Sequence, residues 1–113
     1  GVIEQNSYWS CFRNPTSITV DLEAARSLTG VTVFSRWGGG YHERYSVDLS
    51  PDGENWTEVV DFTSNSQAAT ATGYAHNFPA TTARYIRLNT TGNSWFPGGR
   101  FPRIVEVLAH EAP

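Results

Sequence analysis

Three segments of the sequence bring large aromatic rings together with arginine, and none of them has a regular hydrophobic pattern. They are residues 8–15, 35–43 and 90–102, and the last two also contain clustered glycines. An aromatic ring offers a flat apolar face, and the arginine fork donates several hydrogen bonds in one plane. An aromatic ring exposed to water in such a loop is unfavourable unless it packs on the domain or binds a ligand. We therefore take these side chains as candidate ligand contacts: Arg13, Arg36, Trp37, Tyr41, His42, Trp95, Phe96 and Arg100.

The titratable side chains do not suggest catalysis. A glycosidase needs two carboxylates that face one bond, whereas the acids here are spread over expected strands and turns. The sequence also lacks a nucleophile elbow, a phosphate-binding loop and a metalloprotease helix motif. His76 and His110 have no second base or ligand at a useful spacing, so we expect both to face solvent. The sequence predicts a binding protein and not an enzyme.

Length and composition restrict the class further. The 113 residues fit a single domain, residues 1–113. A net charge of -3 with 17% charged residues is too mild for a nucleic-acid partner, which needs clustered cations. Cys11 is the only cysteine, so no disulfide forms within the chain. No apolar run approaches the roughly 20 residues that span a bilayer, so we expect no membrane span.

Short β-branched and aromatic runs with a period of two predict an all-β fold. The alternation is clearest in residues 17–22 and 44–49. Further strands are expected at residues 30–35, 55–60, 83–89 and 103–110, with a weaker one at 73–78. Even spacing and turn-rich connections favour a sandwich or jelly roll.

The connections between these strands differ in their composition. Asp52 and Gly53 supply the backbone angles of a tight turn, which predicts a hairpin over residues 50–55. Residues 22–28 have helical composition but are too few to form a stable helix. Residues 64–72 are small and polar, so we expect an exposed connection without chemistry.

Ordered motifs along nearly the whole chain resemble one family. The most specific pair is Ser-Pro-Asp-Gly-Glu-Asn-Trp at residues 50–56 and Ala-Arg-Tyr-Ile-Arg-Leu at residues 83–88. Tyr-Trp-Ser at residues 8–10 precedes them, and Ile-Val-Glu-Val at residues 104–107 follows. This series resembles the discoidin domain superfamily, which includes the C-type domains of coagulation factors V and VIII and galactose-binding-like carbohydrate modules of bacterial glycosidases. The resemblance implies a jelly-roll β-sandwich of about eight antiparallel strands, with ligand loops at one end.

The resemblance also implies a function, which is non-catalytic carbohydrate binding. A sugar presents an apolar face and a rim of hydroxyls, so its binder needs an aromatic platform and fixed polar donors. By position in the family, Arg36 holds hydroxyls, Trp95 stacks on the ring and Arg13 contributes a polar contact from the first loop. The expected ligand is a galactose-type sugar or a plant or microbial polysaccharide. The expected role is to target an attached glycoside-active enzyme, secreted or on the cell surface.

Other roles remain open for individual residues. Trp9 and Trp56 lie in strand-edge motifs, so we expect both in the core. Trp37 and Trp95 have the alternative of capping the end of the sandwich, and Arg36 that of a salt bridge with Glu43 or another acid. We expect Arg84 and Arg87 to be structural because the outer face of their strand must be polar.

A structural calcium ion is the only cofactor that the resemblance raises. Glu106 matches a glutamate that completes the calcium site in relatives, but the segment before Tyr8 contains no aspartate. Calcium needs six to eight oxygens, so we expect the domain to fold without a metal. The start at Gly1 without any methionine suggests a piece of a larger protein with covalently attached domains. The short segment before Tyr8 leaves two alternatives: either the first strand of the family is missing, or the module is trimmed.

Two other function classes remain as alternatives. The coagulation-type relatives bind phospholipid through loop hydrophobics, and they carry a disulfide that joins the domain ends and basic residues around those hydrophobics. In this chain the disulfide cannot form and the net charge is negative, so attraction to an anionic membrane should be weak. A protein-binding domain or a structural spacer is the second alternative. Binding of any glycan separates these classes from the first.

Overall fold

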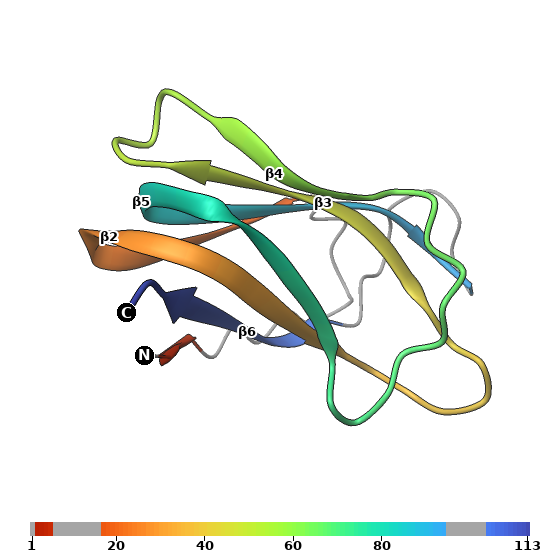
Figure 1. The fold of residues 1–113 in the computed structure, drawn as a ribbon. Coiled ribbons are helices and arrows are strands. Elements are labelled where there is room, and N and C mark those ends of the chain that lie inside the picture. Colours follow the sequence, from red (N-terminus) through yellow and green to blue (C-terminus); the bar gives the residue numbers. More distant parts are fainter. Residues whose placement is uncertain (1, 6–16, 95–103) are drawn as a thin grey trace.

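The computed structural model describes residues 2–5, 17–94 and 104–113. These residues form strands and no helix: β1 (Val2–Gln5), β2 (Ser17–Ser35), β3 (Glu43–Ser50), β4 (Thr57–Phe62), β5 (Tyr74–Asn93) and β6 (Ile104–Glu111). All neighbouring strands are antiparallel, in the order β1-β6-β2-β5-β3-β4 (Figure 1). The all-β fold expected from the sequence is confirmed. The described residues contain no helix of the length and apolar character that a membrane span requires.

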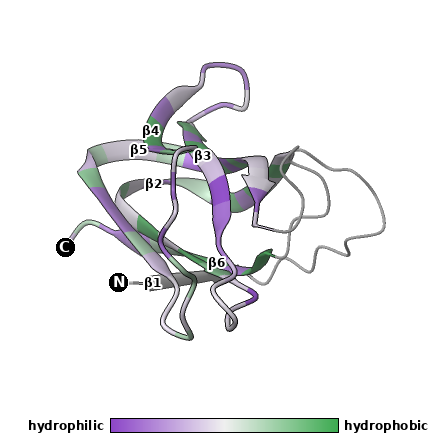
Figure 2. Cartoon of the chain, turned by 90° about the vertical axis from the view of Figure 1, so that its right-hand side faces the viewer, coloured by the Kyte–Doolittle hydropathy of each residue, from purple (hydrophilic) through white to green (hydrophobic). Residues whose placement is uncertain are grey.

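The long strands β2 and β5 fold the sheet into two layers. Residues 17–21 of β2 pair with residues 85–89 of β5, next to β3 and β4. Residues 30–33 of β2 pair with residues 74–77 of β5 on one side and with β6 on the other. Each long strand therefore supplies a segment to both layers, which gives about eight segments and confirms the jelly-roll sandwich. Figure 2 shows the two layers from the end of the sandwich.

β2 changes layer at an irregularity between Asp21 and Arg26. There Glu23 has a φ of 70°, and its N–H donates a hydrogen bond of 2.8 Å to the Asp21 carboxylate. Residues 22–28, whose composition suits a helix, therefore lie in the bend of a strand. Pairing with β5 on both sides of the bend overrides the local preference.

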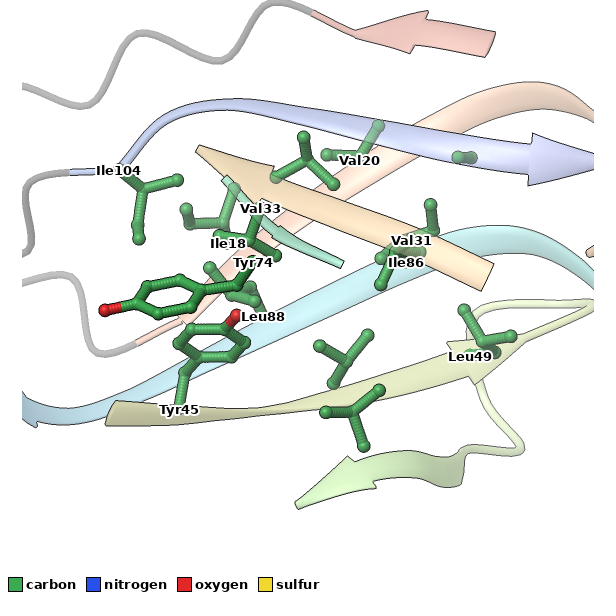
Figure 3. Packing of buried hydrophobic residues seen from close by; sticks show 14 of the residues in the cluster. Ile18, Val20, Val31, Val33, Tyr45, Leu49, Tyr74, Ile86, Leu88 and Ile104 are labelled. Carbon is green, nitrogen blue, oxygen red and sulfur yellow. The ribbon is translucent and has the colours of Figure 1, made fainter. Parts of the chain in front are cut away.

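The hydrophobic core lies between the two layers, as the alternation of period two predicts. Alternate residues of β2, β3 and β5 point inward, and Figure 3 shows many of them in one cluster. Among those that are less than a tenth exposed are Ile18, Val20, Val31, Val33, Tyr45, Val47, Leu49, Tyr74, Ile86 and Leu88. The core holds the strands whose ends carry the candidate site.

The strand pairing defines two ends of the sandwich. Glu43 pairs with Asn93, and Ser35 with Ile104, so residues 36–42 and 63–73 connect strands at the same end, which we call the loop end. Val2 pairs with His110 at the opposite end, where the C-terminus also lies (Figure 1). Residues attached to either terminus therefore continue from the end that does not carry these loops.

The hairpin expected between β3 and β4 is confirmed. Gly53 has a φ of 84°, and the Asp52 carboxylate accepts hydrogen bonds of 2.8 Å from the N–H groups of Glu54 and Asn55. These bonds hold the pKa of Asp52 well below its usual range. The hairpin is thus fixed by its own turn residues.

Trp56, at the end of this hairpin, does not enter the core as the sequence analysis expects. It is half-buried, and the guanidinium carbon of Arg87 lies 4.0 Å from the centre of its ring. Arg87 also donates to the Asp48 carboxylate at 3.0 Å, and Arg84 donates to Asp21 at 2.8 Å. The structural role expected for both arginines is confirmed, but the prediction for Trp56 is wrong because Arg87 holds the ring on the outer face.

Candidate functional site

The most open part of the loop end is the segment of three glycines at residues 38–40. Their φ angles are 106°, 63° and 80°, a region that disfavours other residues, and a Cβ on any of them meets no atom within 4 Å. Tyr41 closes the turn by donating its N–H to the Gly38 carbonyl at 3.2 Å. Just before the glycines, the Trp37 side chain is 59% exposed and Arg36 is also exposed. The segment therefore presents an aromatic ring and an arginine to solvent.

Tyr41 and Glu43 form the buried base of this segment. Tyr41 is 1% exposed and Glu43 is 0% exposed, and the Tyr41 hydroxyl donates a hydrogen bond to the Glu43 carboxylate. Glu43, the acid considered for a salt bridge with Arg36, is thus engaged inside the domain. Tyr41, a candidate ligand contact from the sequence, is placed to support the segment, and its ring offers almost no surface to a ligand.

His42 connects the glycine segment to the end of β5. Its N–H donates to the Ser94 Oγ at 3.1 Å, and the Ser94 N–H donates to the His42 carbonyl at 3.0 Å. These bonds continue the pairing of Glu43 with Asn93 by one residue. Residues 36–42 therefore end beside Ser94, the residue that immediately precedes Trp95. Trp95 itself, Phe96, Arg100 and Arg13 lie outside the described residues, so their roles stay predictions.

Arg44 fixes the ring of His42, although the sequence analysis did not select it. Its Nη2 lies 3.5 Å from the His42 Nε2, and its Nε donates to the Asn65 carbonyl at 3.0 Å. The His42 Nδ1 lies 3.4 Å from the Gly40 carbonyl. Arg44 only donates, so the His42 Nε2 accepts in this contact. His42 is thus held half-buried at the rim of the loop end.

The connection at residues 63–73 packs against the same base. The Asn65 side chain donates to the Glu43 carbonyl at 2.8 Å, and the Ala69 N–H donates to the Tyr41 carbonyl at 2.8 Å. Asn65 and Ala69 are both less than a tenth exposed. The expectation of an exposed connection without chemistry is therefore wrong for these two residues. An asparagine in a turn-rich segment, whose amide satisfies nearby backbone groups, was the signal available in the sequence.

The histidines expected in solvent are both half-buried. The His76 Nε2 lies 2.5 Å from the Tyr45 hydroxyl, and its ring stands against Phe62 with 4.7 Å between centres. Burial lowers the pKa of His76. The His110 Nε2 lies 2.8 Å from the Thr32 Oγ1. The prediction is wrong for both residues. His76 shares the inward side of β5 with Tyr74, whereas His110 lies on the face of β6 opposite to Val107 and Ala109, where Thr32 of the neighbouring strand binds its ring.

Glu106 does not stand among other potential metal ligands. It is half-buried in β6, where it pairs with Phe34. Within residues 17–94 and 104–113, no three His, Cys, Asp or Glu side chains gather at one point. One carboxylate alone does not supply the six to eight oxygens that calcium takes. Glu106 as a calcium ligand stays a prediction.

A two-layered jelly roll with exposed aromatic and arginine side chains at one end defines the class of the protein as a loop-presenting β-sandwich module. The chain belongs to the F5/8 type C domain family, whose model matches residues 2–107. The resemblance to discoidin domains is confirmed. No curated protein matches the chain.

Several solved structures are similar to the chain. The CBM32 of AlyQ in complex with 4,5-unsaturated mannuronic acid is 33% identical, with 88% of this chain and 75% of that one covered and a TM-score of 0.67. A family 89 glycoside hydrolase from Clostridium perfringens is 23% identical over 88% of this chain, with a TM-score of 0.75, but only 10% of its own length is covered. A pectin-binding carbohydrate-binding module is 18% identical, with 99% and 71% covered and a TM-score of 0.68. The last two share the fold.

Proposed function

We propose that this domain binds carbohydrate without catalysing a reaction, through the side chains of its loop end. The observation that carries the proposal is the exposed Trp37 beside the exposed Arg36, on a segment that begins and ends on a buried base. The ring supplies a platform for the apolar face of a sugar, and the guanidinium supplies donors for its hydroxyls. Because the base is packed, binding does not require much ordering.

Membership of the family and the solved relatives support this assignment. A CBM32 module that is 33% identical holds an unsaturated mannuronic acid, and another module of the same fold binds pectin. We propose a galactose-type sugar or a plant or microbial polysaccharide as the ligand here. The small footprint of one loop end gives an affinity of roughly micromolar to millimolar Kd.

The position of the termini supports a targeting role in a secreted or cell-surface protein. The CBM32 in truncated AlyQ accompanies alginate lyase domains, and the chain corresponds to 26% of that structure. In the present domain, β1 begins and β6 ends at the end of the sandwich opposite to the loop end. A catalytic domain joined there leaves the loop end free to meet a glycan.

The test is titration calorimetry with a glycan selected on an array, using the variants Trp37→Ala and Arg36→Ala. Each variant should raise the Kd about fivefold or more, because it removes a stacking surface or a directed hydrogen bond. Val105→Ala and Arg84→Ala are matched controls, since Val105 is exposed on β6 and Arg84 forms an exposed ion pair with Asp21. Both controls should bind as the parent does.

Two outcomes contradict the proposal. If no glycan binds, the domain is not a carbohydrate-binding module, and vesicles of phosphatidylserine and phosphatidylcholine then test the phospholipid alternative. If a glycan binds but both loop variants bind like the parent, the site is not at Trp37 and Arg36. Circular dichroism of each variant confirms that the fold is retained.

A further inference from the structure

A hollow opens on the side of the sandwich beside the connection at residues 63–73, and it does not include the glycine segment. It has a volume of about 110 Å³ and is lined by Phe62, Gln67, Gly73, Tyr74, Ala75 and His76. β4 is the outermost strand of its layer, and residues 74–77 of β5 pair only with β2. The hollow thus lies where both layers present an edge, and none of its lining residues belongs to residues 36–42.

Aromatic rings form the walls of the hollow. The ring centres of Phe62 and Tyr74 are 4.9 Å apart at 67°, and those of Phe62 and His76 are 4.7 Å apart at 76°. Tyr45 backs this group, with its ring 5.1 Å from Phe62 and 6.2 Å from Tyr74. Figure 3 shows Tyr45 and Tyr74 beside one another at the margin of the core. Because these edge-to-face contacts fix the rings, the aromatic surface is preformed.

Two polar groups remain available at this surface. Only the main chain of Gln67 is engaged: its N–H donates to Asn65 at 2.8 Å, and its carbonyl accepts from Tyr74 at 2.8 Å. The exposed Gln67 amide makes no hydrogen bond within the part of the chain that the structure describes. His76 uses Nε2 for the Tyr45 hydroxyl, which fixes the ring and leaves Nδ1 as its second polar atom.

The lining contains no Asp, Glu or Arg, and burial lowers the pKa of His76, so that its imidazole is neutral at pH 7. A charged ligand therefore finds no opposite charge among the lining residues. A neutral ligand with one apolar face and several hydroxyls finds both kinds of partner.

We propose that this hollow is a second binding site, separate from Trp37 and Arg36 of the glycine segment, which takes one neutral pyranose residue. The half-buried Phe62 ring contacts the C–H face of the sugar, while the Gln67 amide and the His76 Nδ1 bond to its hydroxyls. A volume of about 110 Å³ is well below the roughly 300 to 1,000 Å³ of drug-sized sites, so the ring enters only in part. The affinity is in the millimolar range of Kd.

The experiment is an NMR titration of the full chain with galactose, glucose and galacturonic acid as probes. The two neutral sugars should shift the side-chain amide of Gln67 and the imidazole of His76, and galacturonic acid should shift them much less. Gln67→Ala should raise the Kd measured at His76 about fivefold, because one hydrogen bond to the sugar is lost. Ser66→Ala, at an exposed neighbour in the same connection, should leave the Kd unchanged.

Trp37→Ala separates this site from the glycine segment, and the shifts at Gln67 and His76 should persist in it. The proposal is overturned if neither neutral sugar shifts these two groups up to about 100 mM, a concentration that saturates a millimolar site. It is also overturned if Trp37→Ala abolishes the shifts, because they are then relayed from the glycine segment, or if galacturonic acid binds as well as the neutral sugars. Shifts at Gln67 without any at Trp37 leave this site in place and show that these monosaccharides do not bind at Trp37 and Arg36.

Discussion

The two connections that leave the loop end, residues 36–42 and 63–73, differ in how the rest of the domain holds them. The glycine segment is held at its base by Tyr41 and His42, while Trp37 and three glycines project into solvent. The second connection is held along its length by Asn65, Ala69 and the Tyr74 hydroxyl. The domain thus exposes candidate ligand contacts on one connection and uses the other to fix the base beneath them.

The largest difference between the two connections should appear when a glycine in each is replaced by alanine. Gly73 and Gly39 both have positive φ angles, of 79° and 63°. A Cβ on Gly73 meets Phe34, Thr32 and the Val33 carbonyl at 3.0 Å, whereas a Cβ on Gly39 meets no atom within 4 Å. Gly73→Ala should therefore lower the free energy of unfolding by about 2 to 4 kcal/mol, from strain plus overpacking. Gly39→Ala should cost about 1 kcal/mol from strain alone.

Urea unfolding of the two variants measures this difference. If both variants lose the same free energy of unfolding, the two connections do not differ as described. Residues 63–73 would then pack no more closely on the sandwich than the glycine segment does. A larger loss for Gly39→Ala contradicts the described difference more strongly.

A smaller difference in the free energy of unfolding should separate the half-buried Trp56 from the exposed Trp37. Trp56→Ala should cost about 1 to 2 kcal/mol, because the ring is half-buried under Arg87 and not enclosed in the core. Trp37→Ala should change the free energy of unfolding by less than about 0.5 kcal/mol, as expected for an exposed side chain. Thermal or urea unfolding of both variants gives the two values. A cost above about 3 kcal/mol for Trp56→Ala would return this residue to the core, where the sequence places it.

The sequence predicted the fold well because the alternation of period two marks which residues face the core. Residues 17–22 and 44–49 show this alternation, and the Asp52-Gly53 turn needs no contact beyond its own hairpin. The sequence could not show that residues 22–28 bend a strand between layers, since that depends on pairing with β5. Trp56 was misplaced for a related reason. Its environment is Arg87, which lies 31 positions further along the chain and meets it only after β3, β4 and β5 pair.

The candidate site was predicted in part. The exposure of the glycine segment could be predicted because three consecutive glycines have no side chains that pack on the core. The structure places the neighbouring Trp37 and Arg36 in solvent. Tyr41 looked equally suited to a ligand, but its burial depends on Glu43 and on the connection packed beneath it. Asn65 and Arg44 were missed because their partners are backbone atoms brought together only by the fold.

The smallest expected effect is a pH dependence of stability that arises beside the second connection. His76 is held neutral in the folded chain, since burial lowers its pKa, whereas an unfolded chain protonates histidine near pH 6.5. Below about pH 6.5 the unfolded state therefore binds more protons than the folded state. This contribution to the free energy of unfolding is fully present above that pH and is lost as the pH falls toward the lower, folded pKa. The aspartates whose pKa is lowered, Asp21, Asp52 and Asp61, lose their contributions only below about pH 4.

His76→Gln isolates this effect because glutamine retains an acceptor for the Tyr45 hydroxyl but does not titrate. Between about pH 7.5 and about pH 5.5, the urea midpoint of the parent should fall further than that of the variant. His42 and His110 are unchanged in the variant. If the urea midpoint of the parent falls no more steeply than that of the variant, His76 protonates as readily in the folded state as in the unfolded state. The ring then is not enclosed by Phe62 and Tyr45, and the wall of the hollow at β5 is more open than the structure shows.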